Sequence, residues 1–384
     1  MTVAPCPADA TATELLARHT ADDAFYFASP TGGLLASQAG AVLDVGGELT
    51  DIAGAVDTAL AAHPADRVVV GAVGFDPATR VRLSVPEQVW RSGPLPTGLA
   101  IPAQRPGGGM RARRELPSCA RYAAGVQAAV AEMAAGGLSK VVLARALEIT
   151  TAAPVDTALL LRRLAARDPG GYLFAVDTGG GSTLVGSSPE LLVSRRGAEV
   201  VANPLAGSTP RSADPVEDAR RARALLTSEK DQREHAVVVA AVRGALGRLG
   251  VDLRPPAAPT LVSTTAMWHL GTTVRGRVAD PSVSALRLAA ALHPTPAVCG
   301  TPPERAREVI AAHESADRGF FAGLTGWQDA AGDGEWAVTL RCAQVRGDQV
   351  LLYAGAGVVP GSQPEAELAE TEAKLGTVLN GLGL

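Results

Sequence analysis

Lysine is rare in this sequence. The chain has 384 residues and 35 lysines and arginines together, yet lysine occurs at only three positions, Lys140, Lys230 and Lys374. Arginine keeps its proton in a protein, whereas a desolvated lysine can give its proton up. A lysine on the face of a β-strand in this chain therefore suggests chemistry that needs a removable proton.

Other signatures are also missing. The four cysteines lie far apart without metal-ligand spacing, so neither a disulfide framework nor a zinc site is predicted, and a reduced, cytoplasmic protein is expected. No export signal precedes the first elements, and no apolar run reaches membrane-spanning length. The net charge of -4 includes no block of like charges, which argues against nucleic acid or a membrane as partner. Nucleotide-binding glycine motifs are absent as well.

Lys140 belongs to the most distinctive stretch of the chain. Residues 138–149 predict a β-strand, because they are rich in β-branched and aliphatic side chains and follow two glycines. Side chains alternate across a strand, so Lys140 shares a face with Val142, Ala144 and Ala146. A lysine at a strand end that extends its amine into solvent is the plain alternative, and this segment alone leaves both open.

Hairpins set the predicted fold class. Residues 172–177 and 182–186 read as strands joined by a glycine turn, and 191–194 pair with 199–202 in the same way. Helices are interleaved with these antiparallel pairs. The pattern predicts an α+β fold of large, layered antiparallel sheets with helices packed outside, rather than a doubly wound parallel sheet.

The region 92–109 is the loosest part of the chain, with four prolines and a run of three glycines. It is either a domain linker or a long surface connection. We interpret it as a connection, because the segment before it is small for an independent core. The prediction is one domain over 1–384, with an N-terminal subregion 1–110, where 9–25 predict an amphipathic helix, and a catalytic region 115–384.

Acidic residues gather at the starts of two predicted helices. Glu234 lies where the polar first turns of a helix after Ser228 give way to an apolar run. A second helix is predicted to start with a Ser-x-x-Glu capping box at Ser362, and it places Glu367, Glu370 and Lys374 on one face, beside an apolar stripe.

Carboxylates beside a buried stripe need a partner, because an unpaired buried carboxylate is costly. A hard divalent cation such as magnesium would serve, completed by water and an anionic substrate. The alternative is an intrahelical Glu370–Lys374 pair, which stabilises a helix by only about 0.2–0.5 kcal/mol.

Two further features suggest anion binding. Residues 206–211 offer hydroxyl and backbone N–H groups in a predicted turn. Arg341 is predicted to lie within a strand over 336–345, where its guanidinium could bind a carboxylate through two parallel hydrogen bonds. Each signal is weak by itself.

Taken together, the motifs resemble the chorismate-utilising enzymes, the family of anthranilate, aminodeoxychorismate, isochorismate and salicylate synthases. The resemblance is dense over 115–384 and looser before it. The matching runs occur in the family's order: SKVVLAR (139–145), GSSPE (186–190), PLAGSTPR (204–211), EKD with EH (229–231 and 234–235), HL (269–270), PTPAVCG (294–300), and GAG with ET (355–357 and 370–371).

The resemblance implies a fold like that of anthranilate synthase component I and a role for each matching residue. Lys140 matches the base that activates water, and Glu190 matches the general acid on the opposite side of the substrate. Glu234 and Glu370 match magnesium ligands, with Glu367 nearby. The groups expected around the substrate are Ser208, His269, Arg341, Gly355 and Lys374.

The resemblance also implies a subtype. Family members that use ammonia lack a lysine at position 140, so Lys140 indicates water as the nucleophile and no glutaminase partner. The run 293–300 resembles the isochorismate synthase form of the siderophore pathways, which isomerises chorismate to isochorismate. We expect a monomer. The alternatives are a salicylate synthase, which also releases pyruvate, and a non-catalytic module that binds magnesium or an anion.

Overall fold

Two large antiparallel sheets carry most of the strands. The computed structural model describes residues 10–21, 23–37, 40–62, 67–78, 80–254 and 258–384. Within this part, the first sheet contains, in spatial order, β18 (Gly300–Thr301), β8 (Lys140–Thr151), β22 (Gln349–Val358), β21 (Cys342–Arg346), β10 (Ser182–Ser188), β9 (Tyr172–Gly179), β1 (Phe25–Ser29), β2 (Gly32–Ala36) and β6 (Val89–Ser92), with β7 (Met110–Leu116) also paired to β8.

The second sheet has the same antiparallel character. Its strands are, in spatial order, β14 (Val251–Leu253), β17 (Val274–Val278), β12 (Glu199–Asn203), β11 (Leu191–Arg196), β20 (Gly334–Val338), β19 (Leu324–Asp329), β4 (Val68–Val73), β5 (Val81–Pro86) and β3 (Gly40–Val42). A small third sheet consists of β13 (Leu205–Pro210), β16 (Met267–Gly271) and β15 (Thr260–Ser263). Strands of the N-terminal subregion thus pair with strands of the catalytic region in both large sheets.

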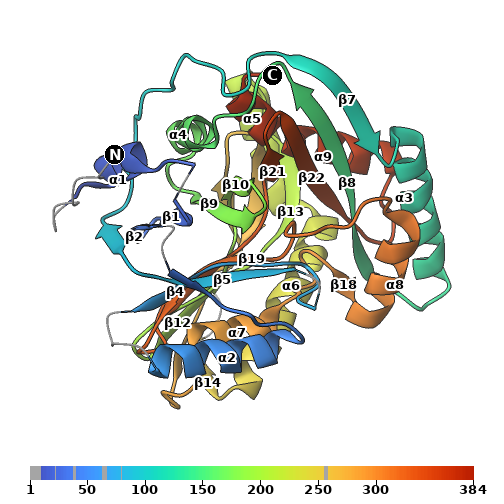
Figure 1. Cartoon of the computed structure of the whole chain (residues 1–384). Helices are drawn as coiled ribbons and strands as arrows, with labels where there is room; N and C mark the ends of the chain where they lie inside the picture. The colour runs from blue at the N-terminus through green and yellow to red at the C-terminus, as the bar shows by residue number, and fades with distance from the viewer. Residues whose placement is uncertain (1–9, 22, 38–39, 63–66, 79, 255–257) are drawn as a thin grey trace.

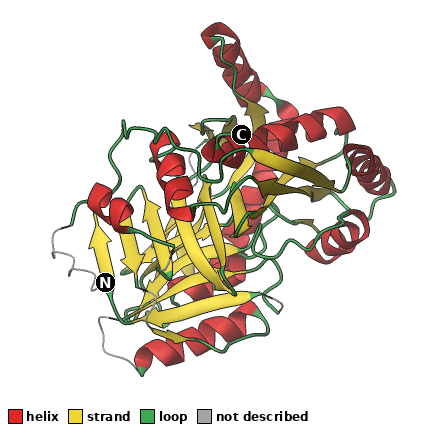
Figure 2. Ribbon diagram, turned by 45° about the horizontal axis from the view of Figure 1, so that its top comes forward, coloured by secondary structure: helices red, strands yellow, loops and turns green. Residues whose placement is uncertain are grey.

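Helices surround the sheets, as Figures 1 and 2 show. They are α1 (Ala12–Arg18), α2 (Leu49–Ala61), α3 (Cys119–Ala134), α4 (Thr157–Arg167), α5 (Pro215–Thr227), α6 (Glu229–Arg248), α7 (Ala285–Leu292), α8 (Pro303–His313) and α9 (Pro364–Leu382). The layered α+β prediction is confirmed. The division of the chain into subregions stays a prediction.

Alternating side chains bury both faces of the first sheet. Phe25 and Phe27 of β1 belong to the core between the large sheets, where Trp336 of β20 is fully buried. Tyr26 and Ala28 of the same strand belong to a second apolar cluster, which includes residues of α1, α4 and α9. Period-2 alternation therefore explains how one strand contributes to two cores.

Two of the chain's crossings between the two large sheets lie next to each other. The chain leaves β10 of the first sheet and enters β11 of the second through Pro189 and Glu190, and it returns from β20 to β21 through 339–341. The Val338 N–H donates to the Glu190 carbonyl at 3.1 Å, and the Ser187 N–H donates to the Arg341 carbonyl at 3.3 Å. The two crossings are therefore hydrogen-bonded to each other.

The position of Arg341 differs from the prediction, because it lies between two strands and not within one. The expected strand over 336–345 is interrupted, because the chain changes sheets there, and Arg341 adopts φ 49°. A non-glycine residue with positive φ is uncommon, so this position is set by its surroundings rather than by local preference.

Three local predictions were also wrong. Residues 206–211 fall mostly in strand β13 instead of a turn, because they pair with β16. The described part of 9–25 is helical only over α1, and Phe25 starts a strand. Helix α9 has no side-chain cap, because the Ser362 hydroxyl accepts the Val359 N–H at 3.1 Å instead.

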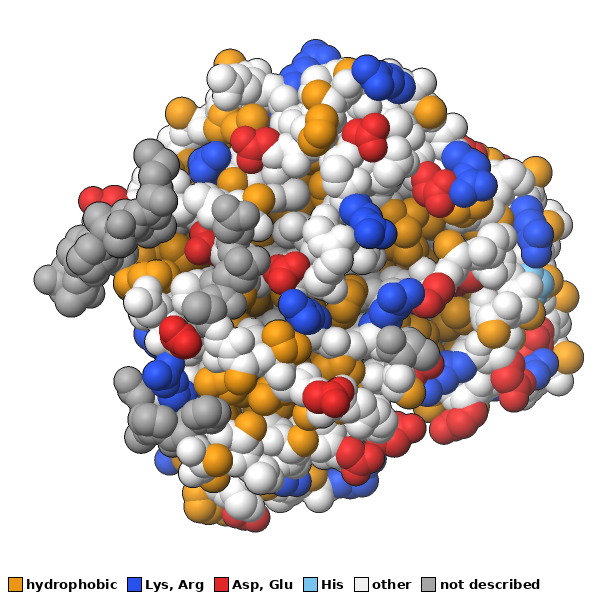
Figure 3. All heavy atoms as spheres, in the orientation of Figure 1, with side chains coloured by type: hydrophobic (Ala, Val, Ile, Leu, Met, Phe, Trp, Pro, Cys, Tyr) orange, Lys and Arg blue, Asp and Glu red, His pale blue; other side chains and the backbone are white. Residues whose placement is uncertain are grey.

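The described residues contain free thiols and no membrane-spanning helix. Among the described residues, no helix is long and apolar enough to cross a membrane. Cys119, Cys299 and Cys342 are free thiols, whereas Cys6 lies outside the described residues. On the face drawn in Figure 3, acidic and basic side chains are interspersed.

Replacing Trp336 with alanine tests the core between the sheets. The Trp336→Ala variant leaves a cavity among side chains of both sheets and is expected to lose about 3–5 kcal/mol of unfolding free energy. Urea denaturation measures this loss. The matched control is Val216→Ala, at a side chain 76% exposed, with an expected change within about 0.5 kcal/mol. Equal changes in the two variants would contradict the assigned core.

Candidate active site

One cavity next to the two crossings brings most of the predicted site residues together. Eight of the ten line it: Glu190, Ser208, Glu234, His269, Arg341, Gly355, Glu370 and Lys374. Lys140 and Glu367 do not line the cavity themselves, but Lys140 contacts Glu234 of the lining, and Glu367 lies one turn before Glu370 on the same helix. The cavity volume is about 60 Å³, enough for a few water molecules, so a larger ligand must displace side chains.

Lys140 and Glu234 form a buried ion pair at the edge of this cavity. Lys140 starts β8 and Glu234 lies in the second turn of α6, and their Nζ and Oε1 atoms are 2.8 Å apart. The two side chains are only 3% and 9% exposed. Gly357 of β22 makes room for them, because a Cβ at this position would lie 2.5 Å from Glu234 Oε1 and 3.3 Å from Lys140 Cε. Lys140 therefore points inward and does not reach solvent.

Glu190 is buried where the chain crosses between the sheets. Burial raises its pKa to about 7, although the Leu205 N–H and the charges of Lys140, Arg341 and Lys374 favour the ionised form. A carboxyl group with this pKa can keep its proton near neutral pH. Glu190 can therefore donate a proton into the cavity, as a general acid must.

Arg341 and His269 form the opposite, cationic part of the lining. An Arg341 guanidinium nitrogen lies 3.1 Å from His269 Nε2. Burial, followed by the charges of Arg341 and Lys374, holds the pKa of His269 well below its usual value, so the ring is neutral. Guanidinium only donates, so Nε2 accepts and the His269 proton is on Nδ1.

The hydrogen-bond donors of the Arg341 guanidinium are not all satisfied. Burial lowers its pKa to about 10, and its Nε has no hydrogen-bond partner. Among the described residues, no carboxylate forms an ion pair with it. A buried guanidinium with an unsatisfied donor at a cavity is suited to bind a carboxylate of a ligand.

Glu370, Lys374 and Ser208 form a second polar group. Lys374 Nζ lies 2.5 Å from Glu370 Oε1 and 2.8 Å from the Gly355 carbonyl. Burial acts to raise the pKa of Glu370, but the Lys374 ammonium and hydrogen bonds from Lys374 and Ser208 bring it below its usual value. Ser208 reaches Glu370 because β13 has an irregular register at Gly207, whose φ is 77°.

Glu367 lies one turn before Glu370 on α9. Its carboxylate lies 3.3 Å from Lys230 Nζ of α6, and its side chain is 4% exposed. Burial and the neighbouring charge of Glu370 raise the pKa of Glu367. The intrahelical Glu370–Lys374 pair, the alternative considered from the sequence, is present, and Glu367 has a lysine partner of its own.

The donor chemistry of these three glutamates suits a hard divalent cation, which prefers carboxylate oxygens. Their arrangement does not form a complete cation site: within the described ranges, no three acidic, histidine or cysteine side chains converge as a metal-binding group. Each carboxylate instead contacts an ammonium group. A cation could bind here only after these contacts rearrange.

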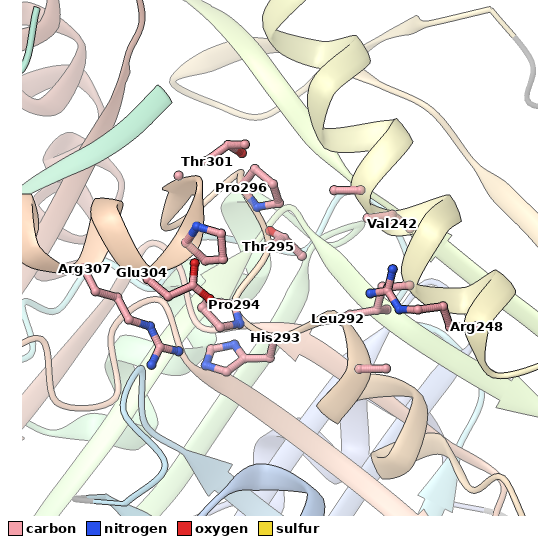
Figure 4. A pocket seen from close by; sticks show the side chains of 15 residues that line it. Val242, Arg248, Leu292, His293, Pro294, Thr295, Pro296, Thr301, Glu304 and Arg307 are labelled. Carbon is pink, nitrogen blue, oxygen red and sulfur yellow. The ribbon is translucent and has the colours of Figure 1, made fainter. Parts of the chain in front are cut away.

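A larger cavity of about 410 Å³ also borders α6. Arg248 and Val242 of α6 line one side of it, and Glu304 and Arg307 of α8 line another (Figure 4). Residues 292–296 contribute further walls. None of the ten predicted site residues lines this cavity, so the predicted chemistry belongs to the smaller one.

Two contributors to the site were not predicted from the sequence. Lys230 was left without a role, although its rarity could have singled it out. Gly357 lies in the matching run 355–357, but the identity of the side chain that approaches it, Glu234, depends on the pairing of β22 with β8. A long-range contact of this kind leaves no local pattern.

Comparison with known proteins identifies the family of the chain. A family model described as chorismate binding enzyme matches residues 102–383. The chain belongs to this family. Chorismate-binding relatives also match in full length: isochorismate synthase DhbC of Bacillus subtilis (strain 168) is 48% identical over 389 residues, covering 97% of this chain and 98% of the relative.

Solved structures agree with this assignment. The crystal structure of DhbC from Bacillus anthracis, named as a 2,3-dihydroxybenzoate-specific isochorismate synthase, superposes with a TM-score of 0.90 at 45% identity, covering 97% of this chain and 99% of that one. Anthranilate synthase component I from Streptococcus pneumoniae TIGR4 has a TM-score of 0.71 at 21% identity, covering 98% and 94%. The second likeness concerns the fold alone.

The raised pKa of Glu190 predicts a pH dependence of stability. In the unfolded chain Glu190 ionises near 4.5, whereas in the folded chain it holds its proton to about pH 7. Its contribution is therefore complete below about pH 4.5 and is lost as pH rises through 7. Relative to Glu190→Gln, the natural protein should lose about 1–3 kcal/mol of unfolding free energy between pH 5 and pH 8. Parallel pH profiles in urea denaturation would contradict the buried, protonated Glu190.

Gly357→Ala tests the close contact at the Lys140–Glu234 pair. The added methyl group must push the Glu234 carboxylate aside, and a misplacement of about 1 Å can lower kcat/KM by about 100-fold. The measurement is chorismate consumption, with thermal unfolding as the check on folding. Gly137→Ala is the matched control, because nothing lies within 4 Å of the added Cβ. Full activity of Gly357→Ala would show that this contact is dispensable.

Proposed function

We propose that this protein is an isochorismate synthase, an isomerase that converts chorismate to isochorismate. The observation that carries the proposal is a cavity lined by Arg341 and by Glu190, whose pKa burial raises to about 7, with the buried Lys140 in contact with Glu234 of the same lining. Full-length relatives bearing this name support it.

The proposed reaction exchanges one hydroxyl group for another. Arg341 binds a substrate carboxylate, and neutral His269 fixes the guanidinium. Lys140, released from Glu234 and in its neutral amine form, takes a proton from a water molecule, whose oxygen attacks C2 of the ring. Glu190 donates its proton to the departing C4 hydroxyl, which leaves as water while the ring double bonds shift. One water is consumed and one released, so the substrate and product are isomers and the step is reversible.

We propose magnesium as the metal ion of the site, with Glu234, Glu370 and Glu367 as the residues that would hold it. Glu234 and Glu370 line the cavity and Glu367 lies one turn before Glu370, and their carboxylate oxygens match the ligand preference of magnesium. When bound, the cation neutralises the ring carboxylate of the substrate. The protein's own contribution is the positioning of these carboxylates by α6 and α9.

The nucleophile and the cellular role follow from the same proposal. Lys140 activates water, so no glutaminase subunit that supplies ammonia is required. The relative named for 2,3-dihydroxybenzoate supports isochorismate supply to catechol siderophores. We further propose that the protein acts as a cytoplasmic monomer.

Lys140 variants test the assignment of the base. Purified protein is incubated with chorismate and magnesium, and the products are separated by chromatography. Lys140→Ala should lower turnover by about 100- to 10,000-fold, the range expected for loss of general base catalysis. Lys140→Arg should be equally inactive, because it keeps the charge and removes the proton acceptor. Arg233→Ala, an exposed cation on α6, is the control with expected normal turnover.

The same incubation distinguishes the proposal from its main alternative. A salicylate synthase would release pyruvate, which a coupled assay detects directly. Pyruvate and salicylate in place of isochorismate would refute the proposed product. Near-normal turnover of Lys140→Ala would instead refute the role of Lys140.

A further inference from the structure

Each of the three lysines of the chain contacts a glutamate of the candidate site. Lys140 contacts Glu234 at 2.8 Å, Lys230 contacts Glu367 at 3.3 Å, and Lys374 contacts Glu370 at 2.5 Å. These carboxylates are the three proposed metal ligands. The sequence contains no other lysine, so every lysine of the chain pairs with one of them.

The pairs compensate a concentration of negative charge. The Glu234, Glu367 and Glu370 side chains are 9%, 4% and 18% exposed. Buried carboxylates are costly without a partner, and neighbouring like charges oppose each other's ionisation. The ammonium groups stabilise the carboxylates where no cation does so.

The pairs also connect separate elements. Lys140 joins β8 to α6 through Glu234, and Lys230 joins α6 to α9 through Glu367, whereas Lys374 and Glu370 lie together on α9. An ammonium nitrogen at hydrogen-bond distance occupies space around the same oxygens that a magnesium ion approaches to about 2.0–2.1 Å. Ammonium and cation therefore compete for these oxygens.

We propose that the three lysines are exchangeable counter-ions of the metal site, which must leave the carboxylates when a divalent cation binds. Lys230 has the freest route, because its side chain is 43% exposed and points from α6 to α9. Release of Lys140 from Glu234 at the same time makes its amine available to the cavity. This inference rests on the proposed function, because it takes the three glutamates as metal ligands.

Lysine suits such an exchange better than arginine. Its ammonium is a compact charge on a flexible four-carbon chain, whereas a guanidinium binds carboxylate through a rigid, bidentate fork. Elsewhere in the fold, arginine makes the static pairs: Arg318 binds Glu314 and also donates to the Val298 and Val142 carbonyls at 2.7 Å.

The test is Mn²⁺ binding to the substrate-free protein, followed by the loss of the free Mn²⁺ signal in electron paramagnetic resonance, with Mg²⁺ as competitor. Lys230→Met should bind Mn²⁺ about two- to fivefold more tightly, the range expected when a competing, partly exposed ion pair is removed. Lys140→Met should also bind it more tightly. Lys230→Arg retains a competing cation that binds carboxylate more rigidly, so it should bind Mn²⁺ no more tightly than the natural protein does.

Arg233→Met controls for the general loss of positive charge. Arg233 precedes Glu234 on the same helix, but its side chain is 78% exposed and faces Glu229. Competition at the oxygens predicts a larger effect for Lys230→Met than for Arg233→Met. Equal effects of the two variants, or weaker Mn²⁺ binding by both lysine variants, would overturn the inference. Because chorismate is absent, the result does not depend on which product the enzyme forms.

Discussion

The buried ion pair between Lys140 and Glu234 is the interaction on which the site depends. It joins the first strand residue of β8 to α6, and both side chains are nearly inaccessible to solvent. A buried pair gains little net stability, but loss of one partner leaves an uncompensated charge in the interior. The pair therefore connects two elements while no cation is bound, and a glycine of the neighbouring strand leaves space for it.

The surrounding sheets explain why this arrangement is possible. The chain passes from one large sheet to the other at Glu190 and again at Arg341. A proton donor and a cation therefore lie at neighbouring crossings, outside the regular strands of both sheets. Regular strands would turn such side chains alternately to one core or the other. The interruption places both at one cavity, and it lets a largely apolar interior contain a polar site.

Much of this organisation was accessible from the sequence, but unevenly. The hairpins around β9 to β12 follow local alternation and turn residues, so their strands were predicted within a few positions. The motif-bearing residues were found by resemblance, and the fold brings eight of ten to one cavity. Arg341 was misplaced because an apolar run continues through a sheet change, which is a tertiary event. The partner of Lys230 could not be predicted from local sequence, since Glu367 is 137 residues away.

The predicted capping box at Ser362 was wrong for a similar reason. A hydroxyl followed three residues later by glutamate matches a helix start, but the same hydroxyl satisfies the Val359 N–H of the incoming chain. A local sequence pattern does not decide from which of two backbone N–H groups the serine hydroxyl accepts a hydrogen bond. The outcome depends on how strand β22 delivers the chain to α9.

The backbone conformation of Arg341 sets a limit on how stable this protein can become. A side chain held at φ 49° commonly costs about 1–3 kcal/mol of folding free energy. Glycine would adopt this conformation without strain, but it would remove the guanidinium from the cavity. Backbone conformation and ligand recognition thus make opposite demands on a single residue.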